Sequence, residues 1–332
     1  MKKRTLGSFM VTLLLLITFL AGCGGSQPTG DQASPSAGQP SPGEAEPASG
    51  DAASEAQQTV YPITVKDAAG RDVTIAAEPQ RIVSVAPSNT ELLFALGKGD
   101  ALVGRSEFDD YPAEALAIES VGGFFPPDYE KILSLEPDLI LLIGGSEEAR
   151  AKLENEYGLT TFVVDPQTFA ELYEGVIALG QVVNAQAAAA DLVAEIQQEV
   201  AAIEAKAATA DTRPVVFYQV WHDPLMTAGP GSFIDDMIRI AGGTNAAAAA
   251  ADPWPQFSLE QLVAANPDLI VTASPEAAQE ALAQKGWESL QAVKEARVLG
   301  LPDENIVVRP GPRLIQGLNW FAEAIHPELF AR

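Results

Sequence analysis

The chain alternates short apolar runs with amphipathic segments of helical spacing. Residues 63–75 alternate apolar and polar positions on both sides of a turn near 67–70, which predicts a β-hairpin. A helix is expected after Ser88 or Asn89 as N-cap, and a second helix at 129–135. Strand and helix in repetition indicate an α/β sheet with helices on both faces. The apolar runs predict short strands at 81–85, 103–104, 139–143 and 160–165.

The pattern changes at residues 183–208, which lack proline and glycine and carry Leu192, Ile196 and Val200 at helical spacing. A helix of this length would span roughly 39 Å, comparable to the diameter of a small domain. Its place between two α/β segments predicts a connecting helix over 183–210, and the alternative is a long surface helix of one domain. Beyond it, strands are expected at 214–220, 297–300 and 305–308, and helices at 232–243 and 312–325.

One unit of the chain occurs twice, 130 residues apart. Residues 129–142 read YEKILSLEPDLILL, and residues 259–272 read LEQLVAANPDLIVT. In each copy the proline is expected to end a helix, the aspartate to turn the chain, and the apolar run to form a buried strand. The sequence therefore predicts two α/β lobes of similar build, at 61–182 and 211–332, joined by one long helix.

The first residues have the pattern of a signal peptide, expected at 1–22, because three basic residues precede an almost wholly apolar run. The only cysteine, Cys23, follows Leu-Ala-Gly. This stretch resembles the lipobox of bacterial lipoproteins, in which the cysteine is lipidated and begins the mature protein. Two or more acyl chains, such as palmitate, would anchor it stably. The alternative is an ordinary signal peptide with an incidental cysteine. Residues 23–60 predict a disordered tether rich in Ser, Gly, Pro and Ala.

Charge and composition exclude several classes of function. The net charge of −25 argues against nucleic acid as a partner, because a phosphate backbone needs a basic surface. With one cysteine, neither a disulfide nor a multi-cysteine metal site can form within the chain. The sequence contains no Gly-x-Ser-x-Gly, His-Glu-x-x-His or Gly-x-x-x-x-Gly-Lys motif, and no Asp/His cluster with metal-ligand spacing. We therefore expect no catalytic residue, no cofactor and no metal site of the protein alone.

Aromatic side chains are concentrated in segments that read as loops. They follow predicted strands or lie beside prolines, whereas core aromatics usually lie inside periodic segments. We expect them to line a cleft between the lobes and to contact a large, flat or partly apolar ligand. The alternative for each is that it seals a loop to its own lobe. The residues are Phe108, Phe124, Phe125, Trp221 and Trp254.

Two histidines and two arginines are further candidates. His222, next to Trp221, is expected to form hydrogen bonds at the rim of the cleft, with ligation of the ligand's metal as the alternative. His326 is expected at the surface. Arg309 and Arg313 are unusual in so acidic a chain. They are expected either to bind ligand carboxylates, amides or phosphate, or to pair with acids on the lobe surface.

Several stretches together resemble one family. RIVSVAPSNTELLFALG, FDDYP, VGGFFPPDYEKILSLEPDLIL, DPWPQFSLEQLVAANPDLIV and RPGPR are similar to the iron-siderophore and cobalamin class of ABC-importer substrate-binding proteins. The match runs from about residue 81 to the C-terminus. The resemblance implies two Rossmann-like lobes bridged by a rigid helix. It also implies a monomer outside the cytoplasm that is no enzyme and delivers its ligand to an ABC permease dimer with its ATPase.

The same resemblance places ligand contacts on Phe108, Phe124, Trp254 and the segment 309–313, and it favours cobalamin as the ligand. Two places depart from the cobalamin-binding pattern: Ile143 precedes Gly144-Gly145, and Trp-His-Asp stands at 221–223. Haem and a ferric siderophore therefore stay open as ligands. A cell-surface adhesion module that reuses the fold is the alternative class.

Glu130 and Glu260 each stand seven residues before the proline of the repeated unit. The resemblance implies that they dock onto arginines of a two-fold permease, one glutamate from each lobe. A doubled partner would need such a doubled contact. The alternative is that both are solvated acids on helix surfaces.

Overall fold

The computed structural model describes residues 58–330. The expected signal peptide at 1–22, Cys23 and nearly all of the tether lie outside the described residues. The first described element is the predicted hairpin, in which β1 (Ile63–Lys66) pairs antiparallel with β2 (Asp72–Ile75). None of the described helices is long and apolar enough to cross a membrane.

The N-terminal lobe is built on a parallel four-stranded sheet in the order β4-β3-β5-β6. Its strands confirm the predictions from apolar runs, and the two central ones are wholly buried, as strands covered on both faces are. The strands are β3 (Ile82–Ser84), β4 (Leu102–Gly104), β5 (Leu139–Leu142) and β6 (Thr161–Val163). The helices are α1 (Pro87–Ala95), η1 (Gly99–Ala101), η2 (Ala113–Ala117), α2 (Tyr129–Ser134), α3 (Glu147–Asn155) and α4 (Phe169–Val182).

Helix α1 begins earlier than predicted. Its N-cap is Ala86, and Pro87 is the first helical residue. Proline suits this position because its ring fixes φ and a first-turn N–H has no intrahelical partner. Ser88 and Asn89 therefore lie inside the first turn, so the prediction that one of them is the N-cap is wrong. The Asn89 amide instead donates to the Leu142 carbonyl at the end of β5 (3.0 Å).

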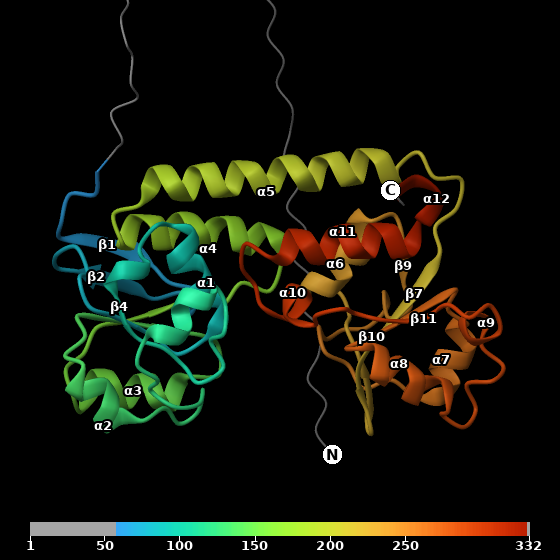
Figure 1. Ribbon diagram of the computed structural model, residues 1–332, viewed down its shortest axis with the longest axis horizontal. Helices are drawn as coiled ribbons and strands as arrows, with labels where there is room; N and C mark the ends of the chain where they lie inside the picture. The colour runs from blue at the N-terminus through green and yellow to red at the C-terminus, as the bar shows by residue number, and fades with distance from the viewer. Residues whose placement is uncertain (1–57, 331–332) are drawn as a thin grey trace, which may run out of the picture. The chain divides into compact units, whose positions relative to one another are not determined.

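One helix, α5 (Gln186–Ala207), packs on both lobes (Figure 1). It contacts α4 of the N-terminal lobe and α6 and α11 of the C-terminal lobe. Its buried face, which includes Val193, Ile196 and Ile203, belongs to a hydrophobic cluster with members in both lobes. The helix begins after Asn184, whose backbone is left-handed (φ 54°), and ends at Ala207, so it is shorter than the predicted 183–210 at both ends.

The C-terminal lobe has a five-stranded sheet in the order β11-β10-β7-β8, with β9 also paired to β7. β9, β10 and β11 are parallel to their neighbours. β8 turns back antiparallel to β7 and lies between the strand predicted at 214–220 and the helix predicted at 232–243. The strands are β7 (Val215–His222), β8 (Leu225–Thr227), β9 (Thr244–Asn245), β10 (Leu269–Thr272) and β11 (Val298–Gly300). The helices are α6 (Phe233–Ile240), α7 (Leu259–Ala265), α8 (Pro275–Leu282), α9 (Gln291–Lys294), α10 (Asn305–Val308), α11 (Leu314–Ile325) and α12 (Pro327–Phe330).

Residues 305–308, predicted as a strand, form the one-turn helix α10 instead. Three consecutive apolar residues do not distinguish a short strand from a helical turn. The turn begins where the Asp303 carboxylate accepts a hydrogen bond from the Asn305 N–H (3.0 Å). Ile306 and Val307 are then both buried, and α10 packs against α11.

The repeated unit has the predicted order in both lobes, since α2 leads into β5 and α7 leads into β10. The aspartate after each proline also binds the start of the neighbouring strand. Asp138 Oδ2 accepts from the Gln80 N–H (2.8 Å), just before β3. Asp268 Oδ2 accepts from the Val215 N–H (2.7 Å), the first residue of β7. These aspartates therefore turn the chain and also fix the adjacent central strand.

His326, expected at the surface, is buried, with 1% of its area exposed. Its Nδ1 lies 3.0 Å from the Glu328 carboxylate, and its Nε2 lies 3.4 Å from the Gly242 carbonyl. Gly242 approaches the ring closely, because a Cβ there would stand 3.0 Å from Nε2. The surface prediction is wrong because a segment 84 residues away covers the ring.

Candidate functional site

In the N-terminal lobe, the structure brings together the aromatic residues predicted to line the site. The rings of Phe108 and Phe124 stack with centroids 4.7 Å apart and planes inclined by 30°. Phe125 lies 6.5 Å from Phe124, and about half of the Phe108 and Phe125 side chains is exposed. The three rings therefore form an exposed aromatic cluster rather than part of the core.

The loop that carries Phe108 is fixed from below by a buried carboxylate. Asp109 is fully buried and accepts hydrogen bonds from the Thr90 hydroxyl of α1 (2.5 Å) and the Ser106 N–H (3.2 Å). The Ser106 hydroxyl donates to the other carboxylate oxygen of Asp109, Oδ1. Burial raises the pKa of Asp109, and these hydrogen bonds oppose the rise. These hydrogen bonds therefore hold the Phe108 loop against α1.

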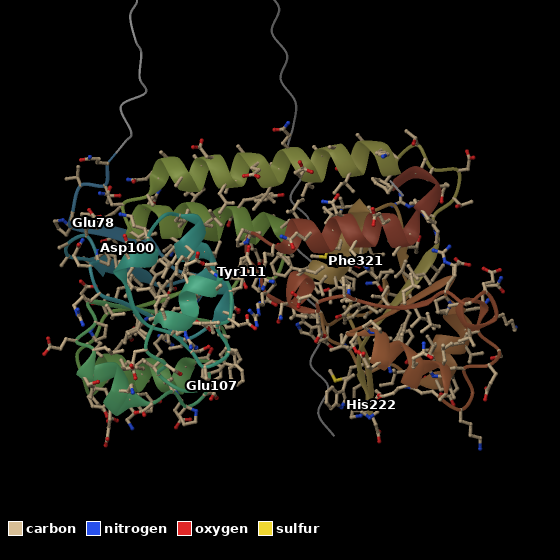
Figure 2. The ribbon with its side chains drawn as sticks, in the orientation of Figure 1. Glu78, Asp100, Glu107, Tyr111, His222 and Phe321 are labelled. Atoms are coloured by element: carbon tan, nitrogen blue, oxygen red, sulfur yellow. The ribbon has the colours of Figure 1, made fainter. Side chains whose placement is uncertain are left out.

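In the C-terminal lobe, Trp221 and His222 lie at the carboxyl end of β7. Both are exposed, their ring centroids are 5.4 Å apart, and the Trp221 indole N–H donates to the Asp223 carbonyl (3.0 Å). The strand predicted at 214–220 therefore extends to His222. Figure 2 places His222 on the side of the C-terminal lobe away from α5, as it does Glu107 on the N-terminal lobe.

Trp254 is 42% exposed and lies in a loop with backbone hydrogen bonds on both sides of it. The Pro253 carbonyl accepts from the Gly229 N–H (2.8 Å), and the Pro255 carbonyl accepts from the Thr227 N–H (3.1 Å). The exposed part of the indole is therefore available to a ligand while the backbone around it is fixed.

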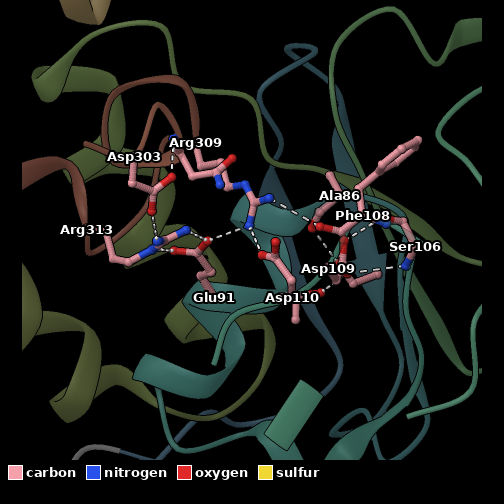
Figure 3. Close-up of polar contacts among 12 residues, drawn as sticks. Ala86, Glu91, Ser106, Phe108, Asp109, Asp110, Asp303, Arg309 and Arg313 are labelled. Carbon is pink, nitrogen blue, oxygen red and sulfur yellow. Dashed lines mark hydrogen bonds and ion pairs between the residues drawn. The ribbon is translucent and has the colours of Figure 1, made fainter. Parts of the chain in front are cut away.

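Arg313 is buried and links the two lobes. Its Nε and Nη2 donate to both oxygens of Glu91 in α1, at 2.8 and 2.7 Å. A third contact reaches Asp303 (3.2 Å), and the guanidinium lies 4.3 Å from the centroid of the Tyr111 ring. The pairing with Glu91 raises the pKa of Arg313. Figure 3 shows the contacts of Arg313 with Glu91 and Asp303.

Arg309 joins the same network from the other side (Figure 3). Its Nη1 donates to Asp110 (2.6 Å) and lies 3.4 Å from Glu91, while its Nη2 donates to the Phe108 carbonyl (3.3 Å). The guanidinium holds the pKa of Asp110 below its usual range. Both arginines therefore pair with acidic residues, which was one of the two expectations. The acids were expected on the surface of the same lobe, but the main ones, Glu91 and Asp110, belong to the opposite lobe. The sequence singles out neither acid.

Glu130 and Glu260 occupy the same place in the two lobes. Each is the second residue of a short helix, α2 behind the N-cap Asp128 and α7 behind the N-cap Ser258. Both are exposed, and within residues 58–330 neither carboxylate has an ion-pair partner. Both helices lie on the side away from α5 (Figure 1). Docking stays a prediction. The described part of the chain also contains no group of three or more His, Cys, Asp or Glu residues arranged to hold a metal ion.

Comparison with known proteins extends this description. The chain matches the family model described as periplasmic binding protein over residues 82–305. It is 36% identical over 337 residues to the uncharacterized ABC transporter substrate-binding lipoprotein YvrC of Bacillus subtilis (strain 168), with 99% of each chain covered. It is 31% identical over 243 residues to a vitamin B12-binding protein of Photorhabdus laumondii, covering 73% of this chain and 86% of that protein.

A solved structure has a similar fold. The periplasmic haem-binding protein RhuT of Roseiflexus sp. RS-1 has a TM-score of 0.67 and 26% identity, over 75% of this chain and 98% of that one. The family match begins at the first residue of β3, ends in α10, and so includes strands of both sheets and all of α5. With two lobes, a shared helix and this extent of similarity, the chain belongs to the periplasmic binding protein family.

Proposed function

We propose that this protein is the lipid-anchored binding component of an ABC importer and that it captures cobalamin outside the cytoplasm. Phe108 carries the proposal: its ring is 46% exposed and stacked on Phe124, while its carbonyl accepts a hydrogen bond from Arg309 of the other lobe. An exposed aromatic pair beside the contact of two lobes suits a large, flat, partly apolar ligand that both lobes bind.

The choice of cobalamin is supported by the likeness to a vitamin B12-binding protein. Haem is the second candidate, supported by the likeness to the haem-binding structure. Both are flat macrocycles that carry a metal, so aromatic contacts alone do not separate them. A ferric siderophore is the third candidate of the same class.

On the C-terminal lobe, Trp221, His222 and Trp254 are the proposed ligand contacts. Of the two arginines, Arg309 is the better candidate for a ligand group. Its partner Asp110 is a 57% exposed side chain that a ligand acceptor can displace. Arg313 is held by the fully buried Glu91 and acts through position rather than contact.

The remaining proposals concern the partner and the membrane. Glu130 and Glu260 would dock onto a permease dimer, because a two-fold partner presents the same surface twice. Cys23 would carry the acyl chains, with residues 23–60 as the tether that gives the lobes reach.

Calorimetric titration of the full-length protein in detergent with cyanocobalamin, haemin and several ferric siderophores tests the ligand. Cobalamin is expected to bind most tightly. Absence of heat with cyanocobalamin at high micromolar concentration, together with binding of haemin, would move the proposal to haem.

A further inference from the structure

A small cavity of about 190 Å³ lies within the C-terminal lobe, beside the carboxyl end of β10. This edge of an α/β sheet is where ligands commonly bind. Trp221 and His222 form part of its lining, so the cavity adjoins the proposed ligand contacts. Its other polar lining residues are Gln219, Thr272, Gln284, Glu304 and the exposed Glu280.

Gln219 has a hydrogen-bonding capacity that the described residues do not use. The residue is 7% exposed, lines the cavity, and its Nε2 has no hydrogen-bond partner. A buried amide donor without a partner is unfavourable, because the group has lost its water without replacement. Such a donor in the wall of a cavity indicates a missing acceptor.

The neighbours of Gln219 across the sheet are also polar. It lies opposite Thr272 of β10 and opposite Thr227 of β8, so the three residues form a row on one face of the sheet. Both threonines are almost fully buried, and Thr227 Oγ1 also lacks a partner. The Thr272 hydroxyl donates to the Ser274 carbonyl (3.0 Å), so the unused hydrogen-bonding capacity of this row belongs to Gln219 and Thr227.

Carboxylates supply the complementary chemistry. Glu304 accepts from the Tyr218 hydroxyl (3.3 Å), which leaves further acceptor sites on its two oxygens, and Glu280 also lines the cavity. Among the described residues that line it, none is an arginine or a lysine. A ligand carboxylate would therefore meet like charge without a cation to offset it.

We propose that this cavity is a subsite for a primary carboxamide arm of the ligand. The carbonyl of the arm accepts from Gln219, and its NH₂ group donates to Glu304, so these two residues determine specificity. The proposal rests on the proposed function and deepens it, because the edge of cobalamin carries carboxamide arms whereas haem carries carboxylates.

The test compares cyanocobalamin with a corrinoid in which the amide arms are carboxylic acids, titrated into the full chain. Gln219→Leu keeps the volume and removes the donor, and it should weaken cyanocobalamin binding about 10-fold. In Glu304→Gln, the difference in affinity between cyanocobalamin and the carboxylic-acid corrinoid should become smaller. The amide oxygen of the new side chain can still accept the hydrogen bond from Tyr218. Gln279→Leu, an exposed position of α8, is the matched control and should change neither affinity. Equal affinity of wild type and Gln219→Leu for cyanocobalamin would overturn the subsite and leave the proposed function intact.

Propionamide and propionate separate the two proposals. Propionamide at high concentration should shift the NMR signals of the Gln219 side-chain NH₂, assigned by their loss in Gln219→Leu, and propionate should not. If cyanocobalamin fails to bind while propionamide shifts these signals, the ligand is wrong and the subsite stands. If propionamide leaves the signals unmoved, the subsite is overturned whatever cyanocobalamin does.

Discussion

Arg313 and Glu91 form a buried bidentate ion pair between the two lobes, with Nε–Oε2 and Nη2–Oε1 distances of 2.8 and 2.7 Å. Their side chains are 8% and 0% exposed. Because both charges have left water, each depends on the other, and removing one leaves an uncompensated buried charge. The pair therefore makes lobe contact a condition of stability.

Glu91→Gln should lower the free energy of unfolding by about 3 kcal/mol, since the Arg313 charge loses its principal partner. Urea unfolding measures the difference. Asp110→Asn is the control, because its side chain is 57% exposed and its pair with Arg309 is screened, so it should cost under about 1 kcal/mol. A Glu91→Gln protein as stable as wild type would show that the pair contributes nothing to holding the lobes.

Two neighbouring aspartates should have opposite effects on stability as pH changes. The pKa of Asp110 is lowered by Arg309, so its contribution is present above its unfolded pKa and is lost as pH falls through the folded pKa. The pKa of Asp109 is raised by burial, so its contribution is present below its unfolded pKa and is lost as pH rises through the folded pKa.

Relative to wild type, Asp110→Asn should therefore become less stable as pH rises from 2 to 7, and Asp109→Asn should become more stable. Urea unfolding of the three proteins across that range gives the two slopes. Slopes of the same sign would contradict the assignment.

Trp254→Ala should weaken ligand binding by about 2 kcal/mol, because an exposed indole on a fixed loop suits a ligand contact. Its stability should stay within about 0.5 kcal/mol of wild type, since backbone bonds hold the loop. Trp287, which is 2% exposed, is the contrasting position, and Trp287→Ala should cost about 3–5 kcal/mol of stability. Calorimetry and thermal unfolding report the two quantities. Unchanged ligand affinity in Trp254→Ala would remove this residue from the site.

Glu130→Lys combined with Glu260→Lys should abolish uptake of the ligand by cells while leaving its affinity for the purified protein unchanged. Glu147→Lys with Glu276→Lys is the matched control, because these exposed acids also stand in the first turn of a helix, one in each lobe. Uptake of labelled ligand by the control should equal wild type. Equal uptake by both double variants would make Glu130 and Glu260 ordinary surface acids.

Cys23→Ser should release the protein from the membrane fraction, because a serine has no thiol to accept a diacylglyceryl group. Fractionation followed by immunoblotting measures this. Retention in the membrane fraction would rule out Cys23 as the anchor.

The sequence predicts those parts of the fold whose causes are local. The run around Ile140 is wholly apolar, and the run around Ile270 is apolar up to its last residue, Thr272. Each follows a Pro-Asp pair, so both strands were predictable from the residues themselves. The error at 305–308 arose because three apolar residues fit either a strand or a turn of helix. The error at His326 arose because its cover, Gly242, is distant in the chain.

The candidate site was predictable to a similar degree. Exposed aromatic residues such as Phe108 and Trp254 could be found because they lie in segments of the sequence that read as loops. The partner of Arg313 could not, because Glu91 is 222 residues away and looks like one more acid in an acidic chain. Nothing in the sequence marks Gln219 as a candidate, because its proposed role rests on a buried amide donor without a hydrogen-bond partner, which only the structure reveals.

The helix α5 shared by both lobes and the buried Arg313–Glu91 ion pair have a consequence for how a partner could recognise the ligand-bound protein. Because the lobes are joined along α5 and again through Arg313, we expect little change in overall shape when the proposed ligand binds. Under the proposed function, an importer that distinguishes the loaded from the empty form would have to recognise a local feature, such as the surface of the ligand or the loop around Phe108. Small-angle scattering curves with and without ligand should accordingly almost coincide.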